Sequence, residues 1–253
     1  MGEPLLAIRG LCKSYGALCA TDHLDLEIEA SEVHALIGPN GAGKSTLIGL
    51  LAGEIVPDAG TIRFDGRDVT GLPVHARAQG GIGRSFQITT LFSHFTALEN
   101  AVLAILAHAG SSFRFLVPAM RDPALVEPAR RLLDGVGLGA RADMAAATLA
   151  HGEQRQLELA LAMAGAPRLL LLDEPTAGMG REDTLAIVAR LKAMRGRTAI
   201  FLVEHDMDAV FALADRITVL VYGRKLVTGR PDEIRVHPEV RAAYLGAIDP
   251  GAA

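Results

Sequence analysis

The sequence predicts an α/β protein with a mixed sheet core, an antiparallel β front end and an inserted α-helical subdomain. Short β-type runs dominate residues 5–64, an Ala- and Leu-rich helical stretch follows, and apolar strands then alternate with a helical pattern. Half of the residues are hydrophobic, which is enough to bury one large core. We therefore expect a single domain over residues 1–253, with a core of residues 1–95 and 166–253 and a helical insertion of residues 96–165.

The front end contains β-type runs at residues 5–9, 24–28, 33–37 and 61–64, and the last of them enters a turn at Asp65-Gly66. Runs rich in apolar residues and bounded by Gly, Asp or Pro are typical of strands. The sequence therefore predicts several strands before any long helix.

Helical patterns follow at residues 98–108, 126–133 and 153–163, separated by Gly and Pro. Gly and Pro commonly end helices, so these residues predict separate helices rather than one long one. This stretch is the expected helical insertion.

Buried-strand runs return at residues 169–173, 200–204 and 217–221, with a helical pattern at residues 182–194 between the first two. Continuous apolar strands that alternate with helices are typical of a parallel sheet covered by helices. These strands are expected to complete the sheet that the front end begins.

Composition argues against several classes of protein. Lys and Arg number 25 against 29 Asp and Glu, so the formal net charge of -4 gives no basic field to attract nucleic acid. Cys12 and Cys19 are the only cysteines, and no Cys/His cluster has metal-ligand spacing, so we expect neither a disulfide framework nor a zinc site. The sequence has no run of about 18 apolar residues and no signal-like start, so we expect a protein of the reducing cytosol.

A phosphate-binding loop follows the apolar run at residues 33–37. Its sequence is Gly38-Pro39-Asn40-Gly41-Ala42-Gly43-Lys44-Ser45-Thr46, and a helical pattern begins at once. Glycines let backbone N–H groups surround a phosphate, Lys44 supplies a positive charge to the β and γ oxygens, and the hydroxyl of Ser45 is a ligand for Mg²⁺. A loop between a strand and a helix is typical of the RecA-like P-loop NTPases, so we expect their fold and these nine residues as nucleotide contacts.

Two adjacent acids, Asp173 and Glu174, end the apolar run at residues 169–173. Side chains alternate along a strand, so the two acids face different directions and can hold different tasks. We expect Asp173 to hold Mg²⁺ either directly or through a bound water, and Glu174 to be the base that orients and deprotonates the attacking water. Acid pairs at strand ends are more often merely solvated, but the phosphate loop upstream favours the catalytic interpretation.

His205 follows the apolar run at residues 200–204. Ligands of parallel sheets bind outside the carboxyl ends of the strands, so His205 is expected at the same edge as the two acids. A lone histidine is usually structural, but at this edge it can sense the γ-phosphate or the attacking water. We therefore include His205 among the catalytic candidates.

At this point the chain resembles the ATP-binding-cassette (ABC) ATPases, and the resemblance extends over nearly its whole length. Besides the loop, the acids and His205, the segment Gly83-Arg84-Ser85-Phe86-Gln87 is similar to the glutamine loop of that family. The resemblance implies that Gln87 contacts Mg²⁺ and the water and links the core to a membrane partner. It also implies that Tyr15 stacks on adenine, the alternative being a half-buried strand tyrosine.

The family signature corresponds to Leu149-Ala150-His151-Gly152-Glu153-Gln154-Arg155, in place of the usual Leu-Ser-Gly-Gly-Gln. The resemblance implies that this loop contacts the γ-phosphate bound by the opposite subunit of a head-to-tail dimer, so Ala150, His151, Gly152 and Glu153 are nucleotide contacts in trans. Ala150 removes a hydroxyl, whereas Gly152 and the helix N-terminus still offer N–H groups, so we expect a weakened contact. The sequence leaves open whether His151 replaces the hydroxyl.

A second departure is the loop Thr176-Ala177-Gly178-Met179-Gly180, which has Gly180 where the family often has an Asp that helps communication across the dimer. Both departures resemble one branch of the family, the cytoplasmic ATPases of branched-chain amino acid importers. Arg84-Ser85-Phe86-Gln87 with Leu91-Phe92, Glu204-His205-Asp206-Met207 and residues 238–246 resemble the same branch.

The resemblance implies ATP and Mg²⁺ as cofactors and the uptake of a small solute as the output, with branched-chain or other amino acids favoured and urea or an amide as the alternative. The implied partners are integral membrane permease subunits, a second identical or different ABC ATPase subunit and, indirectly, an extracytoplasmic solute-binding protein. The implied location is peripheral, on the cytoplasmic face of the inner or plasma membrane.

An apolar cluster near Gln87 is a candidate permease contact. It comprises Leu91, Phe92, Phe95, Phe113, Phe115 and Leu116, with Arg114 and Arg121 as possible rim residues. Core packing accounts for most such residues. A groove that receives short permease helices also needs an apolar floor, so both interpretations stay open.

Two other functions compete with transport. A soluble ABC ATPase that acts on nucleic acid or ribosomes usually has paired cassettes or a long coiled-coil insert, and this sequence has neither, nor a basic excess. A nucleotide-sensing scaffold without catalysis is disfavoured because both Glu174 and His205 are present. We therefore expect an ATP-hydrolysing subunit and no nucleic-acid partner.

Overall fold

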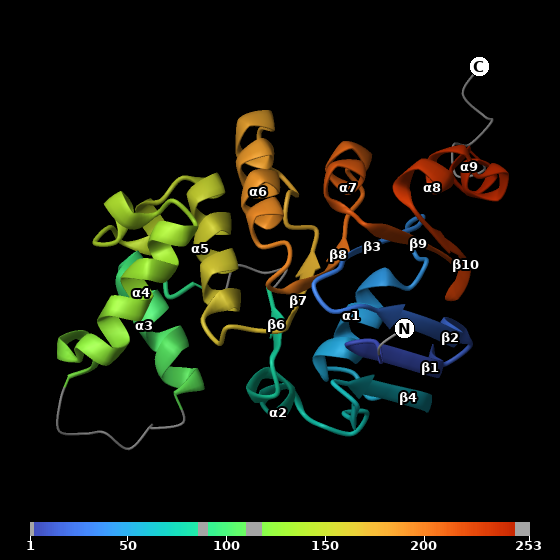
Figure 1. Cartoon of the computed structure of the whole chain (residues 1–253), viewed down its shortest axis with the longest axis horizontal. Helices are drawn as coiled ribbons and strands as arrows, with labels where there is room; N and C mark the ends of the chain where they lie inside the picture. The colour runs from blue at the N-terminus through green and yellow to red at the C-terminus, as the bar shows by residue number, and fades with distance from the viewer. Residues whose placement is uncertain (1–2, 86–90, 110–117, 246–253) are drawn as a thin grey trace.

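The computed structural model describes residues 3–85, 91–109 and 118–245, which form two sheets and the helices around them (Figure 1). The front sheet has the order β2-β1-β4-β5 and the core sheet the order β10-β9-β3-β8-β7-β6. The front strands are β1 (Leu6–Tyr15), β2 (Leu18–Ile28), β4 (Ala59–Phe64) and β5 (Arg67–Asp68). The core strands are β3 (Val33–Ile37), β6 (Ile82–Arg84), β7 (Leu169–Asp173), β8 (Ala199–Val203), β9 (Arg216–Val221) and β10 (Arg224–Gly229).

The helices divide into those around the core sheet and those of the insertion. Around the sheet are α1 (Lys44–Ala52), α2 (Val74–Gln79), α6 (Arg181–Ala193), α7 (Met207–Leu213), α8 (Pro231–Val236) and α9 (Pro238–Leu245). The insertion contributes α3 (Ala97–His108), α4 (Pro123–Gly135) and α5 (His151–Met163), which lie together on the left of Figure 1.

The predicted fold class is confirmed. Strands β1, β2, β4 and β5 pair antiparallel, whereas β9, β3, β8, β7 and β6 pair parallel and β10 joins them antiparallel. The carboxyl ends of β3, β7 and β8 therefore meet at one edge of the core sheet. That edge is where a parallel sheet binds its ligands.

Alternation along the buried strands divides the interior between two layers. On β7, Leu169 and Leu171 pack with α1 and the front sheet, whereas Leu170 and Leu172 pack with the inserted helices and α6. Successive side chains of a strand point to opposite faces, so a fully apolar strand is what a sheet covered on both sides requires. Helix α1 therefore packs between the front sheet and the core sheet.

Local signals fix the start of two inserted helices. The hydroxyl of Thr96 accepts a hydrogen bond from the Glu99 amide at 3.1 Å, and the Glu99 carboxylate accepts one from the Thr96 amide at 2.7 Å. This reciprocal pair satisfies two of the amides that a helix start leaves unpaired. Helix α4 begins with Asp122, whose carboxylate accepts from the Ala124 amide at 2.9 Å.

Within the described residues, none of the helices combines the length and the apolar character that crossing a bilayer requires.

Candidate nucleotide and catalytic site

The phosphate loop connects the carboxyl end of β3 to the first turn of α1. A Cβ on Gly38 would collide with the carbonyl oxygen of Leu220, and one on Gly43 would collide with that of Ala20. Gly43 also has φ 99°, in the region that favours glycine. The fold thus demands glycine at both positions, because neighbouring strands press against the loop on both sides.

Lys44 is the first residue of α1. Its Nζ donates hydrogen bonds to the carbonyl oxygens of Gly38 at 2.7 Å and Pro39 at 3.0 Å. Burial lowers the pKa of Lys44 below its usual value, and the nearby carboxylates of Glu174 and Asp173 oppose that change. The ammonium group is therefore held by its own loop, with the two acids close enough to favour its charged form.

Several predicted nucleotide contacts face solvent. Asn40, Gly41 and Ser45 are exposed around the start of α1. Tyr15, at the end of β1, is also exposed, with the Nζ of Lys13 5.6 Å from the centre of its ring. These side chains are accessible to a ligand, whereas Gln87 lies outside the described residues.

Asp173 ends β7 and is almost fully buried, with 4% of its surface exposed. Neither of its carboxylate oxygens has a hydrogen-bond partner among the described residues. Burial raises the pKa of Asp173, the charge of Arg84 lowers it, and Glu174 raises it further. Carboxylate oxygens without a partner fit a divalent cation, because Mg²⁺ prefers oxygen ligands.

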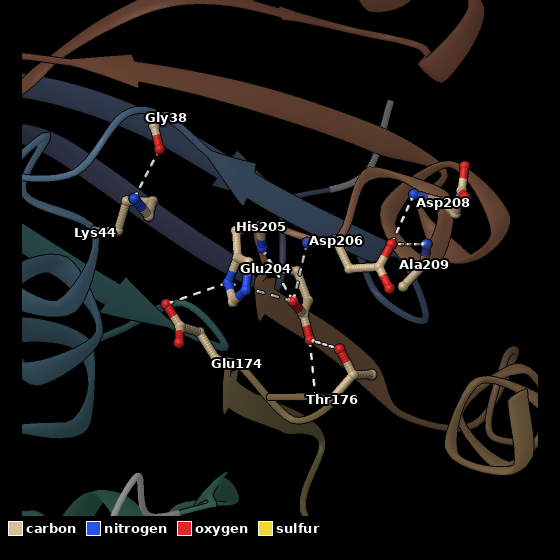
Figure 2. Close-up of polar contacts among 9 residues, drawn as sticks. All are labelled: Gly38, Lys44, Glu174, Thr176, Glu204, His205, Asp206, Asp208 and Ala209. Atoms are coloured by element: carbon tan, nitrogen blue, oxygen red, sulfur yellow. Dashed lines mark hydrogen bonds and ion pairs between the residues drawn. The ribbon is translucent and has the colours of Figure 1, made fainter. Parts of the chain in front are cut away.

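Glu174 and His205 face each other from the ends of β7 and β8 (Figure 2). The Nδ1 atom of His205 lies 3.6 Å from Oε1 of Glu174. Glu174 has φ 49°, a conformation that L residues rarely adopt, and its amide donates to the carbonyl oxygen of Val203 at 2.8 Å. The backbone at Glu174 is thus pinned to the neighbouring strand in a strained conformation.

Sequence reasoning did not assign a role to Glu204, which the structure buries just before His205. Its carboxylate accepts hydrogen bonds from the backbone of Thr176, His205 and Asp206. The only signal in the sequence is an acid at the end of an apolar strand, because Thr176 lies 28 positions away.

The signature loop lies at the start of α5, among the inserted helices and away from α1 (Figure 1). Ala150 precedes the helix and its amide donates to Oε2 of Glu153 at 3.0 Å. Ala150 and His151 are exposed, whereas Gly152 is buried. The pair of Ala150 and Glu153 is half of the arrangement seen at Thr96, since alanine has no side-chain acceptor.

A groove of about 250 Å³ runs beside Ser85, between the core and the inserted helices. Val74, Ile82 and Leu161 are among its apolar lining residues, and the buried Glu158 also lines it. The aromatic residues expected near this groove are only partly described. Phe92 and Phe95 are exposed and stacked 5.4 Å apart, but the groove lining does not include them, and residues 113–116 lie outside the described residues.

The front sheet brings Cys12, Asp22 and His23 together, with potential ligand atoms within 4.8 Å of one another. Sequence spacing does not show this group, because β1 and β2 are paired strands. Asp22 is already paired with His23 at 2.6 Å and with Arg224 at 2.6 Å. We therefore assign the group to an exposed ion-pair network.

Comparison with known families decides what this site belongs to. A family model described as "ABC transporter" matches residues 21–177, which include the phosphate loop, the signature and both acids. The chain belongs to the ABC transporter ATPases. A second model, described as "Branched-chain amino acid ATP-binding cassette transporter", matches residues 224–249 of this ABC ATPase. As an ABC ATPase, the chain binds ATP and hydrolyses it.

Individual relatives agree with the family over the full chain. This ABC ATPase is 40% identical over 254 residues to the high-affinity branched-chain amino acid transport ATP-binding protein BraF of Pseudomonas aeruginosa, covering 97% of this chain and 99% of the relative. It is 36% identical over 255 residues to the corresponding protein LivG of Escherichia coli, with the same coverage. Among solved structures, the ADP conformation of an ATP-binding cassette of an ABC transporter superimposes with a TM-score of 0.86 at 26% identity, covering 97% of this chain and 100% of that one.

Proposed function

We propose that this ABC ATPase powers the import of branched-chain amino acids. The observation that carries the proposal is the 36–40% identity, over nearly the full length, to proteins named for branched-chain amino acid transport. The match of residues 224–249 to the branch-specific family model supports the same cargo. Urea or another amide, the alternative cargo considered from the sequence, has no such support.

In this proposal the reactive groups lie at the carboxyl ends of β7 and β8. Glu174 accepts a proton from the attacking water, and His205, 3.6 Å away, contacts the γ-phosphate and stabilises the position of Glu174. Gln87, which lies outside the described residues, contacts the attacking water in this proposal. Lys44 and the backbone N–H groups of the phosphate loop, which Pro39 lacks, stabilise the negative charge of the phosphates, and Tyr15 stacks on adenine.

The residues present fit a magnesium ion. Asp173, with buried and unpartnered oxygens, and Ser45, exposed at the start of α1, would hold it together with Gln87. The ion would supply positive charge to the phosphate oxygens of ATP. Arg84 moderates the raised pKa of Asp173 and so favours the ionised carboxylate that a metal ligand must be.

We also propose that two ATPase subunits, identical or different, share each nucleotide. The proposal follows from the position of the signature loop, which is exposed on α5 and separated from the phosphate loop of its own chain (Figure 1). Ala150, His151, Gly152 and Glu153 then reach the γ-phosphate bound by the other subunit. In this arrangement residues 96–165 form a helical subdomain on a core of residues 1–95 and 166–253.

The groove beside Ser85 is the proposed permease contact. Its apolar floor suits a short amphipathic helix, and it borders Gly83, Arg84 and Ser85, the described part of the glutamine loop. Docking there would place the chain peripherally on the cytoplasmic face of the inner or plasma membrane. An extracytoplasmic solute-binding protein would then act on the ATPase only through the permease.

Reconstitution tests the cargo directly. The chain, with the permease subunits that co-purify with it, would be placed in proteoliposomes together with the solute-binding protein. We expect leucine, isoleucine or valine to stimulate ATP hydrolysis and to accumulate in the vesicles. Vesicles with the Glu174→Gln complex should accumulate none of the three. Stimulation by urea without stimulation by leucine would assign the alternative cargo.

A further inference from the structure

Glu204, at the carboxyl end of β8, is the most enclosed acid near the reactive groups, with 1% of its surface exposed. Figure 2 shows both of its carboxylate oxygens engaged. Oε1 accepts from the amide of Thr176 at 2.9 Å and from the hydroxyl of Thr176. Oε2 accepts from the amide of His205 at 3.0 Å and more weakly from that of Asp206 at 3.4 Å.

These hydrogen bonds join two loops that the sheet alone does not hold together. The loop after β7 carries Glu174 and then Thr176, and the loop after β8 carries His205. Parallel pairing ends at Asp173 and Val203, so beyond that point only side chains and single backbone contacts fix the loops relative to each other. Glu204 is the described carboxylate that bonds to both.

Because Glu204 is buried, its hydrogen bonds favour one relative position of the two loops. An ionised carboxylate inside a protein is costly unless its oxygens are paired, and charge-assisted hydrogen bonds are stronger there than in water. Any movement of one loop relative to the other would leave an oxygen of Glu204 without a donor. The side chain of His205 is 65% exposed, so little packing restrains its ring. The position of the ring therefore depends on the hydrogen bonds made by the His205 backbone.

The resulting arrangement centres on the imidazole of His205. Its Nδ1 lies 3.6 Å from Oε1 of Glu174 and 4.0 Å from Oε2 of Glu204. A shift of about 1 Å in the position of a reactive group can cost on the order of 100-fold in rate. The separation of Glu174 and His205 is therefore the quantity that matters for hydrolysis.

We propose that Glu204 is a positioning residue that sets the distance between Glu174 and His205, by binding Thr176 on one loop and the amide of His205 on the other. The inference rests on the proposed roles of Glu174 and His205. Glu204 itself does not touch ATP or water in this proposal.

The test is Glu204→Gln, measured as steady-state ATP hydrolysis. Glutamine has nearly the same shape as glutamate, but its NH₂ group cannot accept a hydrogen bond. The N–H or O–H donors of one of the two loops would therefore face another donor instead of an oxygen acceptor. We expect kcat to fall about tenfold or more while KM for ATP changes less than about twofold, because the phosphate-loop contacts of Lys44 do not involve Glu204.

Glu32→Gln is the matched control. Glu32 is also a buried acid, 7% exposed, but it precedes β3 at the opposite edge of the core sheet. It accepts from the Glu29 amide at 2.7 Å and pairs with the His34 ring at 2.9 Å. We expect Glu32→Gln to lower the melting temperature without lowering kcat per folded molecule.

Thr176 provides a second route that does not depend on the folding of Glu204→Gln. Thr176→Ser keeps the hydroxyl that donates to Glu204, and Thr176→Val removes it. We expect Thr176→Ser to retain kcat and Thr176→Val to lose several-fold. The double variant Thr176→Val/Glu204→Gln should lose less than the product of the two single losses, because both break the same link.

The outcomes separate this inference from the proposed function. Wild-type kcat in Glu204→Gln, equal kcat in the valine and serine variants at 176, or a rise in KM alone would overturn the positioning role. Full hydrolysis by Glu174→Gln would instead overturn the catalytic assignment on which the inference rests.

Discussion

The phosphate loop and the signature loop both present backbone amides at the start of a helix, yet the chain builds them differently. The phosphate loop is enclosed: strands press on Gly38 and Gly43, and Lys44 is half-buried and doubly hydrogen-bonded. The signature loop is open, with Ala150 exposed and no side-chain cap on α5. One half of the proposed composite site is thus set by the fold of a single subunit, and the other half gains its function only against a second subunit.

The largest expected effect separates nucleotide binding from hydrolysis. Glu174→Gln should keep ATP binding and reduce kcat about 100-fold or more, because the proton acceptor is lost while the phosphate loop is intact. With hydrolysis blocked, two subunits should stay together as a dimer in the presence of ATP. Size-exclusion chromatography with light scattering would detect this dimer. Glu182→Gln, on an exposed acid of α6, is the control. Unchanged steady-state hydrolysis would remove Glu174 from the role of base.

The next effect concerns the phosphate loop, the enclosed half of the proposed site. Lys44→Ala should weaken ATP binding by the isolated subunit about 10- to 100-fold, because it removes charge-assisted hydrogen bonds to phosphate. Calorimetry measures this directly, and Lys192→Ala, an exposed lysine on α6, is the matched control. Equal affinities in the two variants would count against the assignment of the loop.

Elements defined by continuous burial were predictable from the sequence. Strands β3 and β7 have the predicted bounds, and α5 begins only two residues before the predicted helix. Apolar runs of this kind allow few alternatives, since both faces of the core sheet are covered. The position of the phosphate loop was equally predictable, because its motif stands between a clear strand pattern and a clear helix pattern.

Short elements and long-range contacts were not predictable in the same way. Strand β6 has three residues, IGR, with little apolar pattern, and it exists because it pairs with β7. The need for glycine at 38 arises from Leu220, far away in the sequence. Thr176, which binds Glu204 from the loop after β7, is likewise distant in the sequence, so only the folded arrangement reveals this contact.

A smaller effect concerns the stability of the fold at the start of β3, at the edge of the core sheet opposite the phosphate loop. Burial alone would raise the pKa of Glu32, but hydrogen bonding and charge from His34, with the Glu29 amide and Arg216, lower it below its usual 4.5. A lowered folded pKa means that Glu32 contributes stability above about pH 4.5, and that this contribution is lost as pH falls through the folded pKa. Glu32→Gln should therefore reduce the free energy of unfolding by about 1–3 kcal/mol at pH 7.

Urea unfolding across a pH series checks this prediction, with Glu127→Gln on the exposed face of α4 as the control. The curves of the wild type and of Glu32→Gln should converge as pH falls below 4.5, the usual value for this group. A difference that stays constant with pH would show that shape, and not charge, accounts for the role of Glu32.

The smallest expected effect concerns the open half, at Ala150. Serine there would supply the hydroxyl that the family signature normally has. It would also complete the cap of α5, because Glu153 already accepts from the amide of residue 150 at 3.0 Å, as Glu99 does for Thr96. Capping alone should raise the stability of the isolated subunit by about 1 kcal/mol. A contact with γ-phosphate should in addition strengthen ATP-dependent dimerisation about threefold to tenfold.

Ala150→Asp separates the two contributions. Aspartate caps a helix as well as serine does, but its negative charge would repel a phosphate bound by the other subunit. In the Glu174→Gln background, we expect both variants to melt at higher temperature without ATP, whereas only Ala150→Ser should increase the dimer fraction in ATP and Ala150→Asp should decrease it. Equal dimer fractions in both would mean that residue 150 acts only on its own helix, and that the hydroxyl missing from this chain has no part in joining the subunits.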